Sequence, residues 1–272
     1  MSVLYILREM GFNNLNDLIY ESMQRFMEEP NLIETTARSV LFIGDTHGAI
    51  DVTQKVLREY RDLVELIVFL GDYVDRSDTG LDNLELILKA KLRDPNHIIV
   101  LRGNHESPLT NYYYGFYEEV LAKLGPESYE QFVELFSVMP YAIRVNSVLG
   151  LHGGIPRNVK NVSKFAEIEK GDKEPNNPIA FQILWNDPSP EVKGFEPSPR
   201  GMGIYLFGMD VAEDFLKNNN LYMLVRGHEV CPEGYRIDFG GLVITVFSSR
   251  YHGGEAGALL IKENNELSFL TL

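Results

Sequence analysis

The chain has 272 residues, of which 44% are hydrophobic and 24% are charged, and its net charge at pH 7 is −14. This hydrophobic content is enough for the core of a large globular unit, whereas so acidic a balance disfavours binding to nucleic acid or to an anionic membrane. The absence of a long apolar run, of a signal-peptide pattern and of any cysteine besides Cys231 predicts a cytoplasmic protein without a membrane span.

The first predicted element is an amphipathic helix over residues 14–29. Its apolar residues recur at helical spacing, at Leu15, Leu18, Ile19, Phe26 and Met27. Pro30 ends the pattern. We expect this helix to pack on the rest of the chain, which would then divide into an N-terminal helical segment (residues 1–35) and a main domain (residues 36–272).

Five short apolar runs follow, and each is predicted to be a buried strand. They are residues 40–43, 66–70, 98–101, 148–151 and 221–225. Helical patterns lie between the earlier runs, at residues 49–60, 81–92, 116–124 and 128–139. This alternation of strands and helices indicates an α/β fold.

The C-terminal part changes character. Residues 242–247, 257–261 and 267–272 are predicted strands separated by short turns, which is typical of an antiparallel meander. Two proline-bearing segments further upstream, residues 170–178 and 186–201, are predicted to be loops.

Residues of metal-ligand type follow all five of the buried strands. They are Asp45 and His47, Asp72, Asn104 and His105, His152, and His228. The carboxyl ends of strands in an open α/β sheet meet at one crevice, and the neighbouring glycines allow sharp turns and close approach. A Gly-Asp pair alone is more often a plain turn, but four of the six histidines stand at these strand ends. The recurrence therefore predicts a metal site.

The same residues lie in blocks that resemble the phosphoprotein phosphatase family, the serine/threonine protein phosphatases of the calcineurin-like metallophosphoesterase superfamily. The blocks are GDTHG (44–48), GDYVDR (71–76), LRGNHE (101–106), HGG (152–154), RGH (226–228) and TVFSSRY (245–251). Two more, YGFYEE (114–119) and LWNDP (184–188), favour the protein-phosphatase branch. The resemblance implies that residues 36–272 form a metallophosphatase catalytic domain, a central β-sandwich of mixed sheets flanked by helices.

The resemblance also implies two divalent metal ions. One would bind Asp45, His47 and Asp72, and the other Asp72, Asn104, His152 and His228, so that Asp72 bridges them. Carboxylate, amide and imidazole ligands without a thiolate suit Mn²⁺, with Fe and Zn²⁺ as alternatives, better than Mg²⁺ or Ca²⁺. Two aspartates offset only part of the charge of two such ions, so the site would stay cationic within an acidic protein.

The implied reaction is the hydrolysis of phosphomonoesters by direct attack of a hydroxide that bridges the metals. His105 would be the general acid that protonates the leaving serine or threonine oxygen. Asp75 would hold the other ring nitrogen of His105, since a carboxylate raises the imidazole pKa and fixes the tautomer.

Four residues would bind the substrate or its phosphate. Arg76 and Arg200 would grip phosphate oxygens in the plane of the guanidinium, and Asn104 would donate its amide hydrogen. Tyr251 would border the substrate cleft. For Arg226, phosphate binding and support of its loop are both open.

The implied substrates are phosphoserine and phosphothreonine proteins, and we expect no nucleic-acid, membrane or calmodulin partner. Regulatory subunits leave no clear sequence pattern. Two alternatives stay open: a hydrolase of dinucleoside polyphosphates or small phosphate esters within the same superfamily, and a non-catalytic binding protein that keeps the fold. Assays on a phosphoserine peptide and a diadenosine polyphosphate would separate the first alternative from the phosphatase. Metal analysis and hydrolysis of p-nitrophenyl phosphate would test the second.

Two positions depart from the family pattern. Ser77 stands where the family has glycine, which predicts strain if the backbone there needs a positive φ. The last block continues as SSRYHGG (residues 248–254), whereas eukaryotic members have SAPNYC. A third departure is that the sequence stops at its last predicted strand, and we therefore expect a compact catalytic core of a prokaryotic or archaeal type.

Overall fold

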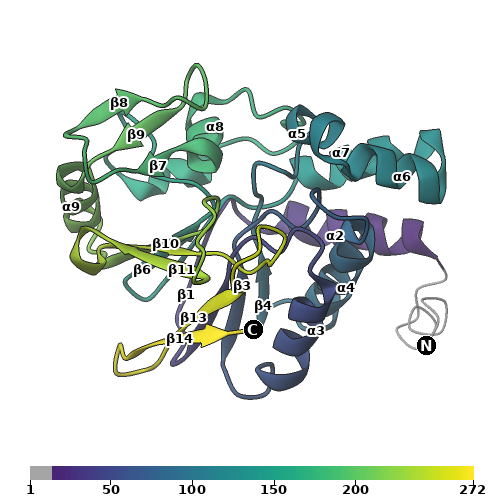
Figure 1. The fold of residues 1–272 in the computed structure, drawn as a ribbon, viewed down its shortest axis with the longest axis horizontal. Helices are drawn as coiled ribbons and strands as arrows, with labels where there is room; N and C mark the ends of the chain where they lie inside the picture. Colours follow the sequence, from purple (N-terminus) through teal and green to yellow (C-terminus); the bar gives the residue numbers. More distant parts are fainter. Residues whose placement is uncertain (1–13) are drawn as a thin grey trace.

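The computed structural model describes residues 14–272, in which two mixed β-sheets form a sandwich with helices on both outer faces (Figure 1). The first sheet has the strand order β1-β5-β6-β10-β12-β11. Its strands are β1 (Leu32–Thr35), β5 (Ala142–Val145), β6 (Val148–Leu151), β10 (Met223–Arg226), β12 (Val243–Val246) and β11 (Tyr235–Asp238). The predicted β-sandwich of mixed sheets is confirmed.

The second sheet has the order β14-β13-β2-β3-β4. Its strands are β14 (Leu267–Thr271), β13 (Gly257–Ile261), β2 (Val40–Ile43), β3 (Leu66–Phe69) and β4 (Ile98–Val100). A small third sheet comprises β7 (Asp187–Pro188), β9 (Tyr205–Phe207) and β8 (Phe195–Pro197).

Helices cover the two sheets unequally. The five-stranded sheet shares its core with α2 (Leu15–Glu28), α3 (Ile50–Glu59), α4 (Gly80–Arg93), α6 (Phe116–Leu124) and α7 (Tyr129–Ser137). The six-stranded sheet shares its core with α8 (Pro178–Trp185) and α9 (Met209–Asn218). The short α5 (Pro108–Tyr114) leads into α6. No helix within residues 14–272 combines the length and the hydropathy that a bilayer crossing requires.

The side chains of β2 point alternately into two different cores. Leu41 and Ile43 pack with the helices, whereas Val40 and Phe42 pack in the core between the two sheets. Successive strand residues point to opposite faces, so a strand buried on both faces is apolar throughout. This is why the predicted strands appear in the sequence as unbroken apolar runs.

The predicted N-terminal helix is present as α2. The Asn14 side chain accepts a hydrogen bond from the Asp17 backbone N–H, which caps the first turn. The apolar face, including Leu18 and Phe26, joins the core formed with α4 and α7. Residues 1–13 of the predicted N-terminal segment lie outside the described residues, and the division of the chain after residue 35 stays a prediction.

The predicted C-terminal meander is wrong in its pairing. Strand β12 lies in the six-stranded sheet, parallel to β10 and antiparallel to β11. Strands β13 and β14 pair with each other in the other sheet, where β13 also pairs with β2. The loop between β12 and β13 therefore crosses from one sheet to the other. Hydrophobic periodicity marks a strand but does not choose its partner.

The predicted loops also contain regular structure. Residues 186–201 include β7 and β8. Pro178 is the first residue of α8, where the fixed φ of proline suits a helix start, and Asn177 caps this helix by accepting from two backbone N–H groups. The loop predicted at residues 170–178 is thus confirmed over residues 170–177, and its last residue, Pro178, begins a helix.

Candidate metal centre and active site

The predicted site residues meet where strands of both sheets end. They follow β2, β3, β4, β6 and β10, which the chain visits in widely separated segments. A cavity of about 170 Å³ lies at this edge. Its lining comprises Asp45, His47, Asp72, Arg76, Asn104, His105, Tyr114, Trp185, Arg200, His228, Val230, Phe247 and Tyr251.

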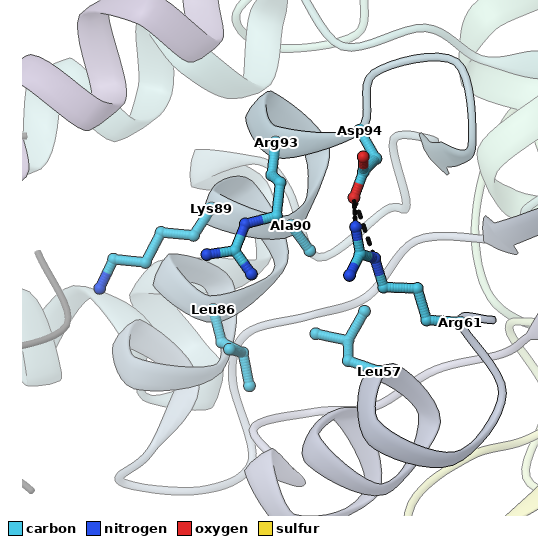
Figure 2. A pocket seen from close by; sticks show the side chains of 7 residues that line it. All are labelled: Leu57, Arg61, Leu86, Lys89, Ala90, Arg93 and Asp94. Atoms are coloured by element: carbon cyan, nitrogen blue, oxygen red, sulfur yellow. Dashed lines mark hydrogen bonds and ion pairs between the residues drawn. The ribbon is translucent and has the colours of Figure 1, made fainter. Parts of the chain in front are cut away.

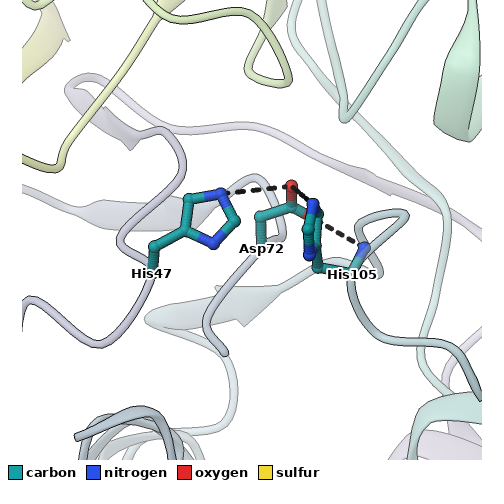
Figure 3. A group of neighbouring side chains, drawn as sticks. All are labelled: His47, Asp72 and His105. Atoms are coloured by element: carbon teal, nitrogen blue, oxygen red, sulfur yellow. Dashed lines mark hydrogen bonds and ion pairs between the residues drawn. The ribbon is translucent and has the colours of Figure 1, made fainter. Parts of the chain in front are cut away.

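One group of predicted ligands lies at the ends of β2 and β3. His47 Nε2 is 3.7 Å from Asp72 Oδ2 and 3.9 Å from Asp45 Oδ2. Figure 3 shows His47 and His105 on either side of Asp72, with His105 Nε2 at 4.0 Å from Asp72 Oδ2. The His47 Nδ1 atom lies 2.8 Å from the Val74 carbonyl oxygen, so Nδ1 carries the proton and Nε2 presents a lone pair.

The second group gathers around Asn104. Its Oδ1 atom lies 2.8 Å from His152 Nε2 and 2.8 Å from His228 Nδ1. His152 Nε2 is also 3.4 Å from Asp72 Oδ1. His152 is fully buried, and its Nδ1 atom contacts the Leu70 carbonyl oxygen at 3.0 Å. Asp72 thus lies between the two groups.

These contacts fit bound cations. The Nδ1 atom of His152 donates to Leu70, and its Nε2 atom faces the oxygens of Asn104 and Asp72. Burial lowers the pKa of His152, but the carboxylates of Asp72 and Asp45 outweigh it and raise this pKa to about 9, so positive charge is favoured at this point, as a proton or as a cation. Acceptors at such distances repel unless positive charge lies between them. Burial and the Asp72 carboxylate raise the pKa of Asp45 to about 7, so positive charge is needed to keep both carboxylates ionised. Oxygen and imidazole donors are ligands that divalent transition metals accept.

The backbone is strained where these side chains enter the cavity. Positive φ angles occur at His47 (43°), Asp72 (59°), Asp75 (68°), Arg76 (69°) and His228 (73°). Each costs about 1–3 kcal/mol, and such residues cluster at functional sites. The strain predicted for Ser77 is absent, because that residue is not among those with positive φ. The turn places its left-handed residues one and two positions earlier.

Glu106 is a buried residue beside the predicted ligands to which the sequence prediction gave no role. This fully buried carboxylate accepts the backbone N–H of Asp72 at 2.7 Å, of Tyr73 at 2.9 Å and of Gly103 at 2.8 Å. It therefore joins the end of β3 to the end of β4. A side chain on Gly103 would overlap Asp72, so the close approach of the two loops requires glycine there. The sequence feature that could have indicated this role is the position of Glu106 in the block LRGNHE (101–106).

His105 and Asp75 form a buried pair beside the predicted ligands. His105 Nδ1 lies 2.6 Å from Asp75 Oδ2, and the backbone N–H of Phe116 donates to Asp75 Oδ1 at 2.8 Å. Burial lowers the pKa of His105, but the carboxylates of Asp72 and Asp75 outweigh it and raise this pKa above its ordinary value. The two carboxylates therefore favour the ring with a proton on each nitrogen.

Two arginines and two tyrosines line the cavity together with the predicted ligands. The Arg76 guanidinium lies 4.0 Å from the Tyr114 ring centre and 5.7 Å from that of Tyr251. Arg200 Nε donates to Asp187 Oδ2 at 2.5 Å, which directs this half-exposed side chain. Tyr114 and Asp187 had no predicted role, although both lie in the quoted blocks YGFYEE and LWNDP.

Arg226 does not belong to the cavity wall. It is fully buried, and its Nη2 atom donates to Asp187 Oδ1 at 2.7 Å while Nη1 donates to Glu229 at 2.6 Å. Its Nε atom donates to the Gly153 carbonyl oxygen. All three nitrogens are engaged by the protein, so of the two roles left open by the sequence the contacts favour support of the loops around Gly153 and His228.

A second cavity, of about 200 Å³, lies between α3 and α4 (Figure 2). It is lined by Leu57, Arg61, Leu86, Lys89, Ala90, Arg93 and Asp94. Its one carboxylate, Asp94, accepts hydrogen bonds from Arg61. This cavity thus lacks the histidine and amide ligands of the first and offers no comparable metal site.

Comparison with known proteins agrees with this geometry. The sequence model of a family described as calcineurin-like phosphoesterase matches residues 38–232. A probable serine/threonine-protein phosphatase of Encephalitozoon cuniculi is 34% identical over 255 residues, which cover 92% of this chain and 55% of that protein. A protein phosphatase 2A catalytic subunit from Dictyostelium discoideum is 32% identical over 92% of this chain and 81% of its own length. The chain thus spans only about half the length of the first relative.

One solved structure is similar over the full chain. It is a protein serine/threonine phosphatase of Saccharomyces cerevisiae, described as similar to human phosphatase PP5. The TM-score is 0.87 at 26% identity, and the match covers 100% of this chain and 96% of that one.

Proposed function

Because the chain belongs to the calcineurin-like phosphoesterase family and, within it, to the serine/threonine protein phosphatases, we propose that it is a metal-dependent protein serine/threonine phosphatase. The observation that carries this proposal is one cavity in which two ligand groups share Asp72. Arg76, Arg200 and the His105–Asp75 pair lie around the same cavity. Its proposed substrates are proteins phosphorylated on serine or threonine.

The proposed ligands divide between two divalent ions, with Mn²⁺ preferred and Fe or Zn²⁺ as alternatives. Asp45, His47 and Asp72 would hold one ion, and Asp72, Asn104, His152 and His228 the other. When bound, such ions supply positive charge that polarises the phosphate and makes water a stronger nucleophile. Asn104 would direct its oxygen to the metal and its amide hydrogens to the phosphate.

His105 would act on the leaving group. An alkoxide leaves poorly, so the serine or threonine oxygen needs a proton as its bond to phosphorus breaks. The Nδ1 proton is held by Asp75, which leaves the Nε2 proton as the one to be transferred. Asp75 is fully buried and is not among the residues that line the cavity. It would therefore orient the ring of His105 without contacting the substrate itself.

Arg76 and Arg200, which line the same cavity as the proposed ligands, would bind the phosphate. A guanidinium offers parallel N–H donors to two phosphate oxygens. The rings of Tyr114 and Tyr251 hold Arg76 in place, and Asp187 holds Nε of Arg200. Tyr251 is 43% exposed and lines the cavity, so it would also contact the residue that carries the phosphate.

The test compares three substrates with the purified protein loaded with Mn²⁺. We expect turnover of a phosphoserine peptide and of p-nitrophenyl phosphate, with much slower hydrolysis of diadenosine tetraphosphate. Faster hydrolysis of the dinucleotide would instead identify a dinucleoside polyphosphate hydrolase. A protein with neither bound metal nor activity on any of the three would be a binding protein, and the proposal would be rejected.

Replacing Arg200 by alanine is expected to weaken phosphate binding. A hydrogen bond to a charged group contributes about 1.5–3 kcal/mol, so the inhibition constant of inorganic phosphate should rise about tenfold or more. The KM for a phosphoserine peptide should rise with it, while metal content stays unchanged. The matched control is Arg144→Ala on β5, outside the cavity, where Arg144 pairs with Glu34. Equal phosphate inhibition of wild type and Arg200→Ala would remove Arg200 from the binding site.

A further inference from the structure

Asn111 on α5 is a buried polar residue that the mechanism above does not use. It is 0% exposed, and its amide makes hydrogen bonds in three directions. The Nδ2 atom donates to Asp75 Oδ2 at 3.0 Å and to the His105 carbonyl oxygen at 2.7 Å. The Oδ1 atom accepts from the Tyr129 hydroxyl at 3.0 Å. Asn111 thus contacts both members of the proposed proton-donating pair.

These bonds complete the surroundings of the Asp75 carboxylate. Its Oδ2 atom accepts from His105 and from Asn111, and its Oδ1 atom accepts from the backbone N–H of Phe116. A fully buried carboxylate needs several hydrogen-bond donors to replace the water that it has lost. Asn111 also binds the backbone of His105, so one amide sets the distance between the carboxylate and the imidazole.

The orientation of the amide is determined by its neighbours. With the oxygen and nitrogen of Asn111 exchanged, an oxygen would face the Asp75 carboxylate and the His105 carbonyl, both of which are acceptors. The Tyr129 hydroxyl donates to the remaining oxygen. Tyr129 on α7 is 4% exposed, and its ring packs against Tyr112 and Tyr117, with ring centres 5.6 Å and 4.9 Å away.

We propose that Asn111 is a positioning residue for proton transfer to the leaving group, and that Tyr129 holds Asn111 in this role. The inference rests on the proposed phosphatase function. Asn111 keeps Asp75 on His105 Nδ1, so that Nε2 remains aimed into the cavity with the proton that the leaving oxygen receives. A hydrogen-bond chain thus runs from α7 through α5 to the loop after β3 and ends at the acid.

The first test uses leaving groups that differ in their need for a proton. Asn111→Leu keeps the branched shape of the side chain but removes the two bonds donated by Nδ2 and the one accepted by Oδ1. A misplaced general acid loses part of its contribution of about 10²–10⁴-fold, so we expect kcat on a phosphoserine peptide to fall by about 10- to 100-fold. The loss on p-nitrophenyl phosphate should be at most about threefold, because its leaving group needs little protonation. Equal losses on both substrates would show a merely structural role and overturn the inference.

A double mutant sharpens the test. In the His105→Asn background, Asn111→Leu should add less than about a threefold loss on the phosphoserine peptide, because the acid that it positions is already gone. Losses that multiply would contradict the inference. The matched control is Asn219→Leu, which removes an equally well bonded, buried asparagine on the α9 side of the molecule. It should lower thermal stability without changing the ratio of the two activities.

Tyr129→Phe serves if Asn111→Leu does not fold. This substitution removes only the hydroxyl that donates to Asn111. We therefore expect a smaller decrease in kcat than for Asn111→Leu, and only on the phosphoserine peptide. No change in the ratio of the two activities would overturn the role of Tyr129. Wild-type protein that binds metal and hydrolyses p-nitrophenyl phosphate but not the phosphoserine peptide would refute the proposed function itself, which is a different outcome from the failure of this inference.

Discussion

Replacing Asp72 by asparagine is expected to deplete both proposed metal ions. Its Oδ2 atom is 3.7 Å from His47 Nε2, and its Oδ1 atom is 3.4 Å from His152 Nε2, so each oxygen faces a different ligand group. The asparagine side chain would offer the two metal ions only one oxygen and no negative charge. Metal analysis after Mn²⁺ loading should find about two ions per wild-type chain and well under one in the variant, with activity lower by about 10³-fold or more.

The control for this variant is Asp210→Asn, the same substitution at an aspartate that only accepts from the Gly194 backbone. Its metal content should equal that of wild type. The folded state of Asp72→Asn should survive, since the new amide oxygen can still accept from the His105 backbone N–H as Asp72 Oδ1 does at 2.8 Å. Full retention of two ions by a folded Asp72→Asn protein would contradict the bridging role.

Replacing His105 by asparagine should reduce turnover of a phosphoserine peptide by about 10²–10⁴-fold, the usual contribution of a general acid. Asparagine cannot hold a transferable proton, although it can still hydrogen-bond to Asp75. The loss on p-nitrophenyl phosphate should be much smaller, because that leaving group departs as a stable anion. Steady-state kinetics on the two substrates provide the measurement.

Metal content decides between two roles for His105. Its Nε2 atom is 4.0 Å from Asp72 Oδ2, close enough that a metal ion held by both is a geometric alternative to proton donation. Loss of metal from His105→Asn would favour that alternative, and equal losses on both substrates would exclude the acid role. His97→Asn, at the one histidine of residues 14–272 without a place near the cavity or its rim, should change neither activity nor metal content.

Much of this molecule could be predicted from local sequence alone. The run at residues 40–43 coincides with β2, and Asp45 follows it as expected. Such strands are recognised because burial on both faces demands unbroken apolar residues. The residues of metal-ligand type after each strand could be recognised for a related reason. Packing does not require histidine or aspartate in a loop at the end of a buried strand, so their recurrence there indicates a site.

The tertiary structure alone decided which segments meet. Nothing in residues 243–246 indicated that β12 would join β10 and β11 while β13 paired with β2 in the other sheet. Arg226 and Asn111 are further cases, because their roles follow from partners distant in the chain, Asp187 and Asp75. Propensity and periodicity depend on neighbouring residues, whereas pairing and buried hydrogen bonds depend on contacts that form only when the whole core packs. The sequence by itself thus determined the element types and the chemistry at their ends, and the fold determined how those ends are arranged.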